Sequence, residues 1–217
     1  MKITLVAFDD FTDIDLFLMW DILKRVRRPD WEVKIVGDQA SHLSTNGIQV
    51  ATHGALAEAN DADVVLFASG KGTRQMIRDD DFLRAFRLNP ARQLVGSQCS
   101  GALILARLAL LDGIPATTHL TVQRELGEFG VRVVDAPLVA VGNVATAGGC
   151  LSGLYLAAWV LERTLGAELR RAVTALVAPD GEEAAQEGRI NAALSRTEFT
   201  RLPPLSQPVP ATTAAGG

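Results

Sequence analysis

The sequence predicts an α/β fold in which a mostly parallel sheet carries helices on both faces. Short apolar segments alternate with longer segments of helical periodicity, as expected for parallel strands joined by crossover helices. The chain of 217 residues is long enough for one large domain, and its sequence contains no internal repeat. Hydrophobic residues make up 48% of the chain and aromatic residues only 6%, so the core should be mainly aliphatic.

Strands and helices alternate along the first half of the chain. Each predicted strand is a short apolar or alternating segment, and each predicted helix carries apolar residues at helical spacing. The Asn46-Gly47 pair lies between two short segments and predicts a β-hairpin turn. The predicted strands are 3–8, 31–36 and 64–68, and the predicted helices are 14–23 and 74–88.

The second half continues this pattern from a central strand, turn and helix. An apolar segment leads into Gly96, and an Ala- and Leu-rich segment leads out of Gly101. Further strands are predicted at 131–134, 138–141 and 144–146, and helices at 120–129, 151–164 and 167–177. We expect residues 1–200 to form a single domain, and the Pro-, Ala- and Gly-rich residues 201–217 to form a flexible or extended tail.

Composition and charge argue against several classes of protein. The formal net charge of −4 disfavours nucleic acid as the main partner. No apolar segment reaches about 18 residues without a charge, so we expect no membrane span. The strand pattern begins at residue 3, which argues against a secretory signal peptide, and two cysteines are too few for a disulfide framework. We therefore expect a cytoplasmic protein with no nucleic-acid or membrane partner.

Cys99 lies at the turn between a predicted strand and a predicted helix. A thiol there feels the positive end of the helix dipole and unpaired backbone N–H groups. Both favour the thiolate, so we expect the pKa of this cysteine to lie below its ordinary value of about 8.5, and we expect strained backbone dihedrals at the turn. Small buried cysteines also pack like alanine, and position alone does not decide between these roles.

Other polar positions have structural and functional interpretations. Asp15 lies in the first turn of an otherwise apolar helix, where a carboxylate usually serves as a cap or dipole partner. Cys150 opens a later helix and is expected to pack in the core. His119 follows Cys99 by 20 positions and is either structural or catalytic. At His42 and His53 we expect exposed polar residues and not metal ligands.

A glycine-rich turn, Ser69-Gly70-Lys71-Gly72, follows the predicted strand 64–68. Such a turn can present backbone N–H groups to an anion, although its spacing differs from that of a phosphate-binding P-loop. It is equally well explained as a simple strand-to-helix connection. Because sites in parallel sheets lie at the carboxyl ends of the strands, we expect this turn, Cys99 and the segment before Asp15 to share one edge.

Five motifs together are typical of a known family: Ile14-Asp15-Leu16, Ser97-Gln98-Cys99-Ser100-Gly101-Ala102, Leu110-Leu111-Asp112-Gly113, Ala116-Thr117-Thr118-His119 and Thr146-Ala147-Gly148-Gly149. On these motifs the chain resembles the ThiJ/PfpI superfamily over most of residues 3–165, and within it the isocyanide hydratase branch. The resemblance implies a flavodoxin-like three-layer sandwich with a nucleophile-elbow cysteine.

The resemblance also implies roles for individual residues. Cys99 would be the nucleophile, Asp15 its carboxylate partner, and Ser100 the hydroxyl after the cysteine, where the family usually has threonine. Substrate binding or oxyanion stabilisation would fall to a second set of residues, namely Gly70, Lys71, Phe17, His119 and Gly148.

Three departures from the family pattern lie near these residues. The chain has Phe17-Leu18-Met19 where the branch usually has Thr-Gly-Pro, and this changes the pocket beside Asp15. It has Ala68-Ser69-Gly70 where Pro-Gly-Gly is usual, and Ser152-Gly153-Leu154-Tyr155 where Ala-Gly-Ile-Asp is frequent. None of these departures removes the Cys–Asp pair.

The implied reaction is the addition of water to an isocyanide, which would make the protein a cysteine-dependent hydro-lyase. Cys99 would attack the isocyanide carbon, Asp15 would protonate it, and water would release an N-substituted formamide from the thioimidate. We expect a small-molecule substrate, no cofactor, no metal ion and, from the resemblance, a homodimer. The alternatives are a glyoxalase-like or amidase-like enzyme, a sensor related to AraC-type regulator domains, and a redox sensor that oxidises Cys99.

Overall fold

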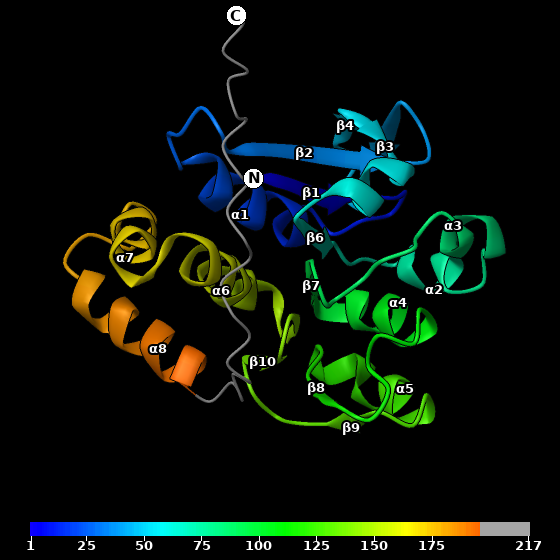
Figure 1. Cartoon of the computed structure of the whole chain (residues 1–217). Helices are drawn as coiled ribbons and strands as arrows, with labels where there is room; N and C mark the ends of the chain where they lie inside the picture. Colours follow the sequence, from blue (N-terminus) through cyan, green and yellow to red (C-terminus); the bar gives the residue numbers. More distant parts are fainter. Residues whose placement is uncertain (196–217) are drawn as a thin grey trace, which may run out of the picture.

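A seven-stranded sheet crosses the middle of the protein, with helices on both of its faces (Figure 1). The computed structural model describes residues 1–195. The strand order is β10-β11-β7-β6-β1-β2-β5, and every neighbouring pair is parallel except β10 with β11. The predicted α/β fold with a mostly parallel sheet is therefore confirmed. The strands are β1 Lys2–Val6, β2 Glu32–Gly37, β5 Gly54–Ala55, β6 Val64–Phe67, β7 Leu94–Gln98, β10 Leu138–Val141 and β11 Val144–Ala147.

The helices cover the sheet from two sides. Helices α1 and α6 pack against each other on one side, and α4 and α5 lie on the other (Figure 1). The α-helices are α1 Asp13–Lys24, α2 Thr73–Met76, α3 Asp80–Arg84, α4 Ala102–Arg107, α5 Gln123–Glu128, α6 Gly153–Leu165, α7 Ala167–Ala175 and α8 Glu183–Ser195. Short 3-10 helices are η1 Leu56–Asp61, η2 Cys99–Gly101, η3 Leu120–Val122 and η4 Cys150–Ser152.

The central strands are nearly continuous apolar segments because helices cover both faces of the sheet. Every residue of β6 and β7 is buried, and so is every residue of β1 except Lys2. This arrangement leaves only the ends of the strands free to present polar groups. The mainly aliphatic core expected from the composition is found here.

Two predicted helices are divided in the structure. The segment 74–88 contains α2 and α3, because the Asp79 carboxylate accepts hydrogen bonds from the amides of Asp81 (2.9 Å) and Phe82 (3.0 Å) and so begins a new helix. The segment 120–129 begins as the 3-10 helix η3 before it continues as α5.

The C-terminal part of the described chain contains a helix that the sequence did not predict. Helix α8 has only two large apolar residues, Ile190 and Leu194, and buries besides them Gln186 and Ala193, so its apolar periodicity is weak. The predicted tail 201–217, and the last residues of the predicted domain 1–200, lie outside the described residues. No helix within residues 1–195 is long and apolar enough to cross a membrane.

A small antiparallel hairpin fixes the beginning of α1. It consists of β3 Ser41–Leu43 and β4 Gln49–Ala51, joined through the predicted Asn46-Gly47 turn. Asp13, the first residue of α1, accepts hydrogen bonds from the side chains of Ser44 (2.6 Å) and Asn46 (2.7 Å). The hairpin thus holds α1 from outside the main sheet. A second small sheet pairs β8 Pro115–Ala116 with β9 Arg132–Val133.

The expectation that His42 is exposed is wrong. Its side chain in β3 is only 1% exposed, and its ring nitrogens lie 3.2 Å from a carboxylate oxygen of Asp9 and 3.3 Å from one of Asp38. The imidazole therefore connects the hairpin to the loop after β1 and to the end of β2.

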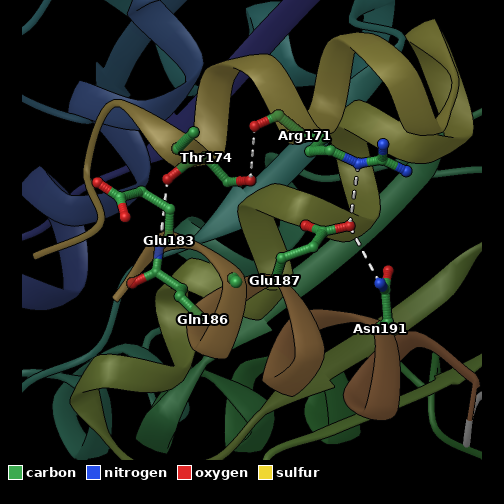
Figure 2. Close-up of a pocket in the computed structure, with 8 residues that line it drawn as sticks. Arg171, Thr174, Glu183, Gln186, Glu187 and Asn191 are labelled. Carbon is green, nitrogen blue, oxygen red and sulfur yellow. Dashed lines mark hydrogen bonds and ion pairs between the residues drawn. The ribbon is translucent and has the colours of Figure 1, made fainter. Parts of the chain in front are cut away.

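A buried arginine joins the last three helices. Arg170 in α7 is 2% exposed and donates hydrogen bonds to Glu162 (3.0 Å), to Asn191 (2.9 Å) and to Glu187. Beside this cluster, a cavity of about 390 Å³ lies between α7 and α8 (Figure 2). None of the predicted site residues lines this cavity, whose lining residues are Arg171, Thr174, Ala175, Glu183, Ala184, Gln186, Glu187 and Asn191.

Replacing Arg170 with alanine should lower the free energy of unfolding by about 2–4 kcal/mol, because two glutamates lose their shared cation. Both glutamates are partly exposed, which keeps the loss below that of a fully buried pair. Urea unfolding followed by circular dichroism measures the change. The matched control is Arg171→Ala, since Arg171 is exposed and lies 3.4 Å from Glu187; its effect should stay within about 0.5 kcal/mol. Equal losses in both variants would contradict the role given to Arg170.

Candidate active site

The parallel strands bring four separate segments to one edge of the sheet. Strand β7 pairs with β6 through Ser97 and Phe67, and with β11 through Gln98 and Ala147. The segments that follow these three strands therefore emerge side by side, and α1 follows the neighbouring strand β1. They contribute four polar side chains to one site: Asp15, Ser69, Cys99 and Cys150.

Cys99 occupies a strained elbow between β7 and η2. Its φ is +51°, a left-handed conformation that costs energy for a residue with a Cβ atom. The amide of Ser100 donates a hydrogen bond to the sulfur, and the hydroxyl of Thr118 donates one to the Cys99 carbonyl at 2.8 Å. The strained dihedrals predicted for the elbow are confirmed.

Two glycines let the turn after β6 approach the elbow closely. A Cβ atom on Gly101 would lie 2.7 Å from the carbonyl oxygen of Ala68. Gly70 has a φ of +155°, and a Cβ atom there would lie 2.1 Å from the carbonyl oxygen of Asp10. Only glycine fits at both positions, and their close packing places Ser69 beside the elbow.

Asp15 points into this site and does not cap its own helix. Its side chain is fully buried, and Oδ2 accepts a hydrogen bond from the hydroxyl of Ser69. Its Oδ1 has no hydrogen-bond partner among the described residues. One carboxylate oxygen lies within 4.8 Å of the sulfurs of both Cys99 and Cys150. The structure therefore brings together Cys99 and Asp15, the two residues to which the resemblance assigns the chemistry.

The expectation of a lowered pKa at Cys99 is wrong. Burial and the negative charge of Asp15 raise the pKa of this thiol to about 11, although the nearby Ser69 hydroxyl and a hydrogen bond from the Ser100 amide oppose the shift. Beside this carboxylate, the helix-start position is not enough to favour the thiolate. Cys99 therefore rests as a thiol at neutral pH.

Cys150 also departs from its expected role as a core residue. It is partly exposed and lies beside Asp15, and burial together with the contact to that carboxylate raises its pKa to about 12. The side-chain amide of Gln98 fixes this segment, since it donates to the carbonyls of Gly149 (2.8 Å) and Cys150 (3.1 Å). The residue just before the elbow thus holds the second cysteine next to the first.

The comparisons with known proteins point to one family. A model of the DJ-1/PfpI family matches residues 1–163. The chain belongs to this family. It is 27% identical over 175 residues to an isonitrile hydratase of Pseudomonas putida, in an alignment that covers 80% of this chain and 76% of the relative.

Solved structures show the same DJ-1/PfpI fold. Schizosaccharomyces pombe DJ-1 superposes with a TM-score of 0.70 and 19% identity, over 82% of this chain and all (100%) of that one. A two-domain protein from Anabaena variabilis, with dj-1/thij/pfpi-like and ferritin-like domains, matches with a TM-score of 0.67 and 21% identity over 75% of this chain. This chain spans only 47% of that longer protein.

The hydroxyl of Ser100, which follows Cys99 at the elbow, faces the turn after β6. Its oxygen accepts a hydrogen bond from the amide of Gly70 at 3.3 Å and lies 3.0 Å from the hydroxyl of Thr73. Ser100 therefore fixes the turn that carries Ser69, and the Gly70 amide is already bonded within it.

The remaining predicted binding residues are Phe17, His119, Gly148 and Lys71, and none of them is one of the four polar residues of the site. Phe17 is half-buried and packs edge to face on Phe11, with ring centroids 6.1 Å apart. The ring of His119 bonds to the hydroxyl of Thr121 at 2.8 Å and lies near the Gly149 segment. Gly148 is buried, and Lys71 is exposed.

Sequence reasoning placed the turn containing Ser69 at the same edge as Cys99 and quoted Gln98 in the elbow motif, but it gave no role in the site to Ser69, Gln98 or Cys150. Each lies at or just after the carboxyl end of a strand, as Cys99 does. The signal was present in the sequence, but only the strand order shows that β6, β7 and β11 are neighbours.

Alkylation of Cys99 should be slow at neutral pH. A thiol with a pKa of about 11 is ionised in only about one molecule per thousand at pH 8, so its reaction with iodoacetamide should rise about tenfold per pH unit. Asp15→Asn removes a negative charge that raises the pKa, so it should speed alkylation several-fold. Mass spectrometry of the Cys99 peptide measures the rate. Asp21→Asn, on an exposed part of α1, is the matched control; an unchanged rate in Asp15→Asn would refute the coupling.

Proposed function

We propose that this protein adds water to an isocyanide to give an N-substituted formamide. One observation carries the proposal: the buried carboxylate of Asp15 lies beside the sulfur of Cys99 at a strained elbow. An isocyanide carbon must accept a nucleophile and a proton, and this pair supplies both. The similarity to an isonitrile hydratase, at 27% identity, supports the same reaction.

The first step joins the sulfur to the terminal carbon of the isocyanide. The carboxylate of Asp15 takes the thiol proton as the sulfur attacks, and then delivers that proton to the same carbon. The S–H bond breaks, the C–S and C–H bonds form, and the product is a thioimidate on Cys99. Because the proton moves during attack, this step needs no free thiolate at rest.

The second step regenerates the free thiol of Cys99. Asp15 removes a proton from a water molecule, whose oxygen attacks the thioimidate carbon. Asp15 passes this proton to the nitrogen. The C–S bond then breaks as the C=O bond forms, and the remaining hydroxyl proton goes to the sulfur. The products are the N-substituted formamide and the free thiol of Cys99. Ser69 holds the carboxylate in place during both steps through its hydrogen bond to Oδ2.

Apolar residues flank Asp15 and Cys150 in the sequence, and on this basis we propose an apolar substituent on the isocyanide. Ile14 precedes Asp15 and is 40% exposed, and Leu151 follows Cys150 and is 73% exposed. Phe17, two residues after Asp15 in α1, is half-buried. These apolar groups suit an aryl or alkyl isocyanide. The expected homodimer and cytoplasmic location stay predictions.

Formamide production from an aryl isocyanide tests the proposal directly. Cys99→Ser should abolish turnover, and Asp15→Asn should lower kcat/KM by roughly 100-fold or more, because it removes the group that transfers the proton. Asp21→Asn should match the unaltered protein, and circular dichroism confirms that each variant is folded. Unchanged turnover in Asp15→Asn would contradict the mechanism. Turnover of glyoxal, with no formamide from any isocyanide, would favour a glyoxalase-like enzyme in its place.

Hydration and alkylation should respond differently to pH. Alkylation needs the thiolate and rises with pH, whereas hydration uses the thiol together with its proton. We therefore expect kcat/KM for an aryl isocyanide to vary by less than about threefold between pH 7 and 9, a range well below the pKa of about 11 for Cys99. Initial-rate measurements across this range give the profile. A tenfold rise per pH unit would show that attack requires a preformed thiolate.

A further inference from the structure

Three metal-binding side chains from separate segments converge at the elbow. Asp15 in α1, Cys99 after β7 and Cys150 after β11 each present one ligand atom, and these atoms all lie within 4.8 Å of one another. Asp15 is fully buried, while both cysteines are partly exposed, so the group can be reached from solvent. The proposed hydration reaction uses Asp15 and Cys99 but gives Cys150 no role.

The spacing suits a tetrahedral cation. Zinc binds thiolate sulfur at about 2.3 Å and carboxylate oxygen at about 2.0–2.2 Å, which places neighbouring ligand atoms on the order of 3.5–4 Å apart. The observed limit of 4.8 Å exceeds this spacing by only about 1 Å, so the ligand atoms need to approach one another by about that much when a cation binds. Two sulfurs and one carboxylate form a donor set that prefers a soft divalent cation.

The carboxylate of Asp15 has a free oxygen in this site. Oδ1 is buried and has no hydrogen-bond partner within residues 1–195, whereas Oδ2 accepts from Ser69. Buried acceptors are normally paired, so an unpartnered one marks a place where a further group can bind. The hydroxyl of Ser69 orients the carboxylate, as hydrogen-bond donors behind metal ligands commonly do.

The backbone of Cys150 is held in place by the side chain of Gln98. Gln98 is buried, and its side-chain amide holds the carbonyls of Gly149 and Cys150. The same residue immediately precedes Cys99, so one side chain joins the two backbone segments that carry the cysteines. Segments already held together lose less conformational freedom when a cation binds.

We infer that Asp15, Cys99 and Cys150 form a binding site for a soft divalent cation such as Zn²⁺, with a fourth position open to solvent. Binding releases the two thiol protons to solvent and forms two metal–sulfur bonds and one metal–oxygen bond. A cation held there occupies the sulfur that attacks the isocyanide. Metal binding and hydration therefore exclude each other, a consequence that rests on the proposed function.

Cobalt titration of the full-length, reduced and metal-stripped protein tests the site, because Co²⁺ bound by thiolates absorbs characteristically. We expect one equivalent of Co²⁺ to give thiolate-to-cobalt absorption that Zn²⁺ abolishes. Cys150→Ser should lose about half of this absorption and weaken Zn²⁺ binding by roughly 100-fold or more, beyond the loss typical of outer-shell changes. Competition with a chromophoric chelator measures that affinity. Intact mass confirms beforehand that both thiols are reduced.

His119→Ala is the matched control, since this histidine lies near the Gly149 segment but is not one of the three ligands. It should keep the absorption and the Zn²⁺ affinity. Absence of thiolate absorption in the unaltered protein would overturn the site. So would a Cys150→Ser variant that binds like the unaltered protein, or a loss of affinity in His119→Ala alone.

Activity measurements separate this inference from the proposed function. The cobalt spectra involve no isocyanide, so they decide the metal site even if no formamide forms. Where formamide does form, Zn²⁺ should inhibit the unaltered protein but not Cys150→Ser, which keeps Asp15 and Cys99. Hydration that continues at full rate with Zn²⁺ bound would overturn the exclusion.

Discussion

The parallel pairing of β7 between β6 and β11 is the constraint on which the site depends. Parallel neighbours end at the same edge of a sheet, so the segments after these strands meet without any long loop. The elbow cysteine, the serine that orients the carboxylate and the second cysteine all follow from this register. A shift in one pairing would separate the sulfurs from each other and from Asp15.

Two unfavourable features are concentrated within this one edge. Cys99 has a left-handed backbone, and Asp15 has a buried oxygen with no hydrogen-bond partner among the described residues. Such features typically cost about 1–3 kcal/mol each and persist only when the surrounding structure holds them. Here the fully buried central strands and the close packing at Gly70 and Gly101 hold them. Their grouping at one place is itself typical of a functional site.

The fold could be predicted from the sequence because it follows from local periodicity. The elbow at Cys99 and the importance of Asp15 were also accessible, the first from a strand–cysteine–helix pattern and the second from a resemblance. The direction of the pKa shift at Cys99 was not, because it depends on burial and on a charge from another segment. Cys150 was misjudged for the same reason, since its neighbours in space come from α1 and β7. Helix α8 was missed because its buried face is small.

The hairpin of β3 and β4 contacts the beginning of the helix that carries Asp15. The side chains of Ser44 and Asn46 donate hydrogen bonds to Asp13, which lies two residues before Asp15. The hairpin itself lies outside the main sheet. Because Asp13 begins the helix that carries Asp15, the hairpin contributes to the placement of the buried carboxylate without supplying any group to the site. The orientation of one reacting group therefore depends on residues at the surface of the protein, far along the chain from the elbow.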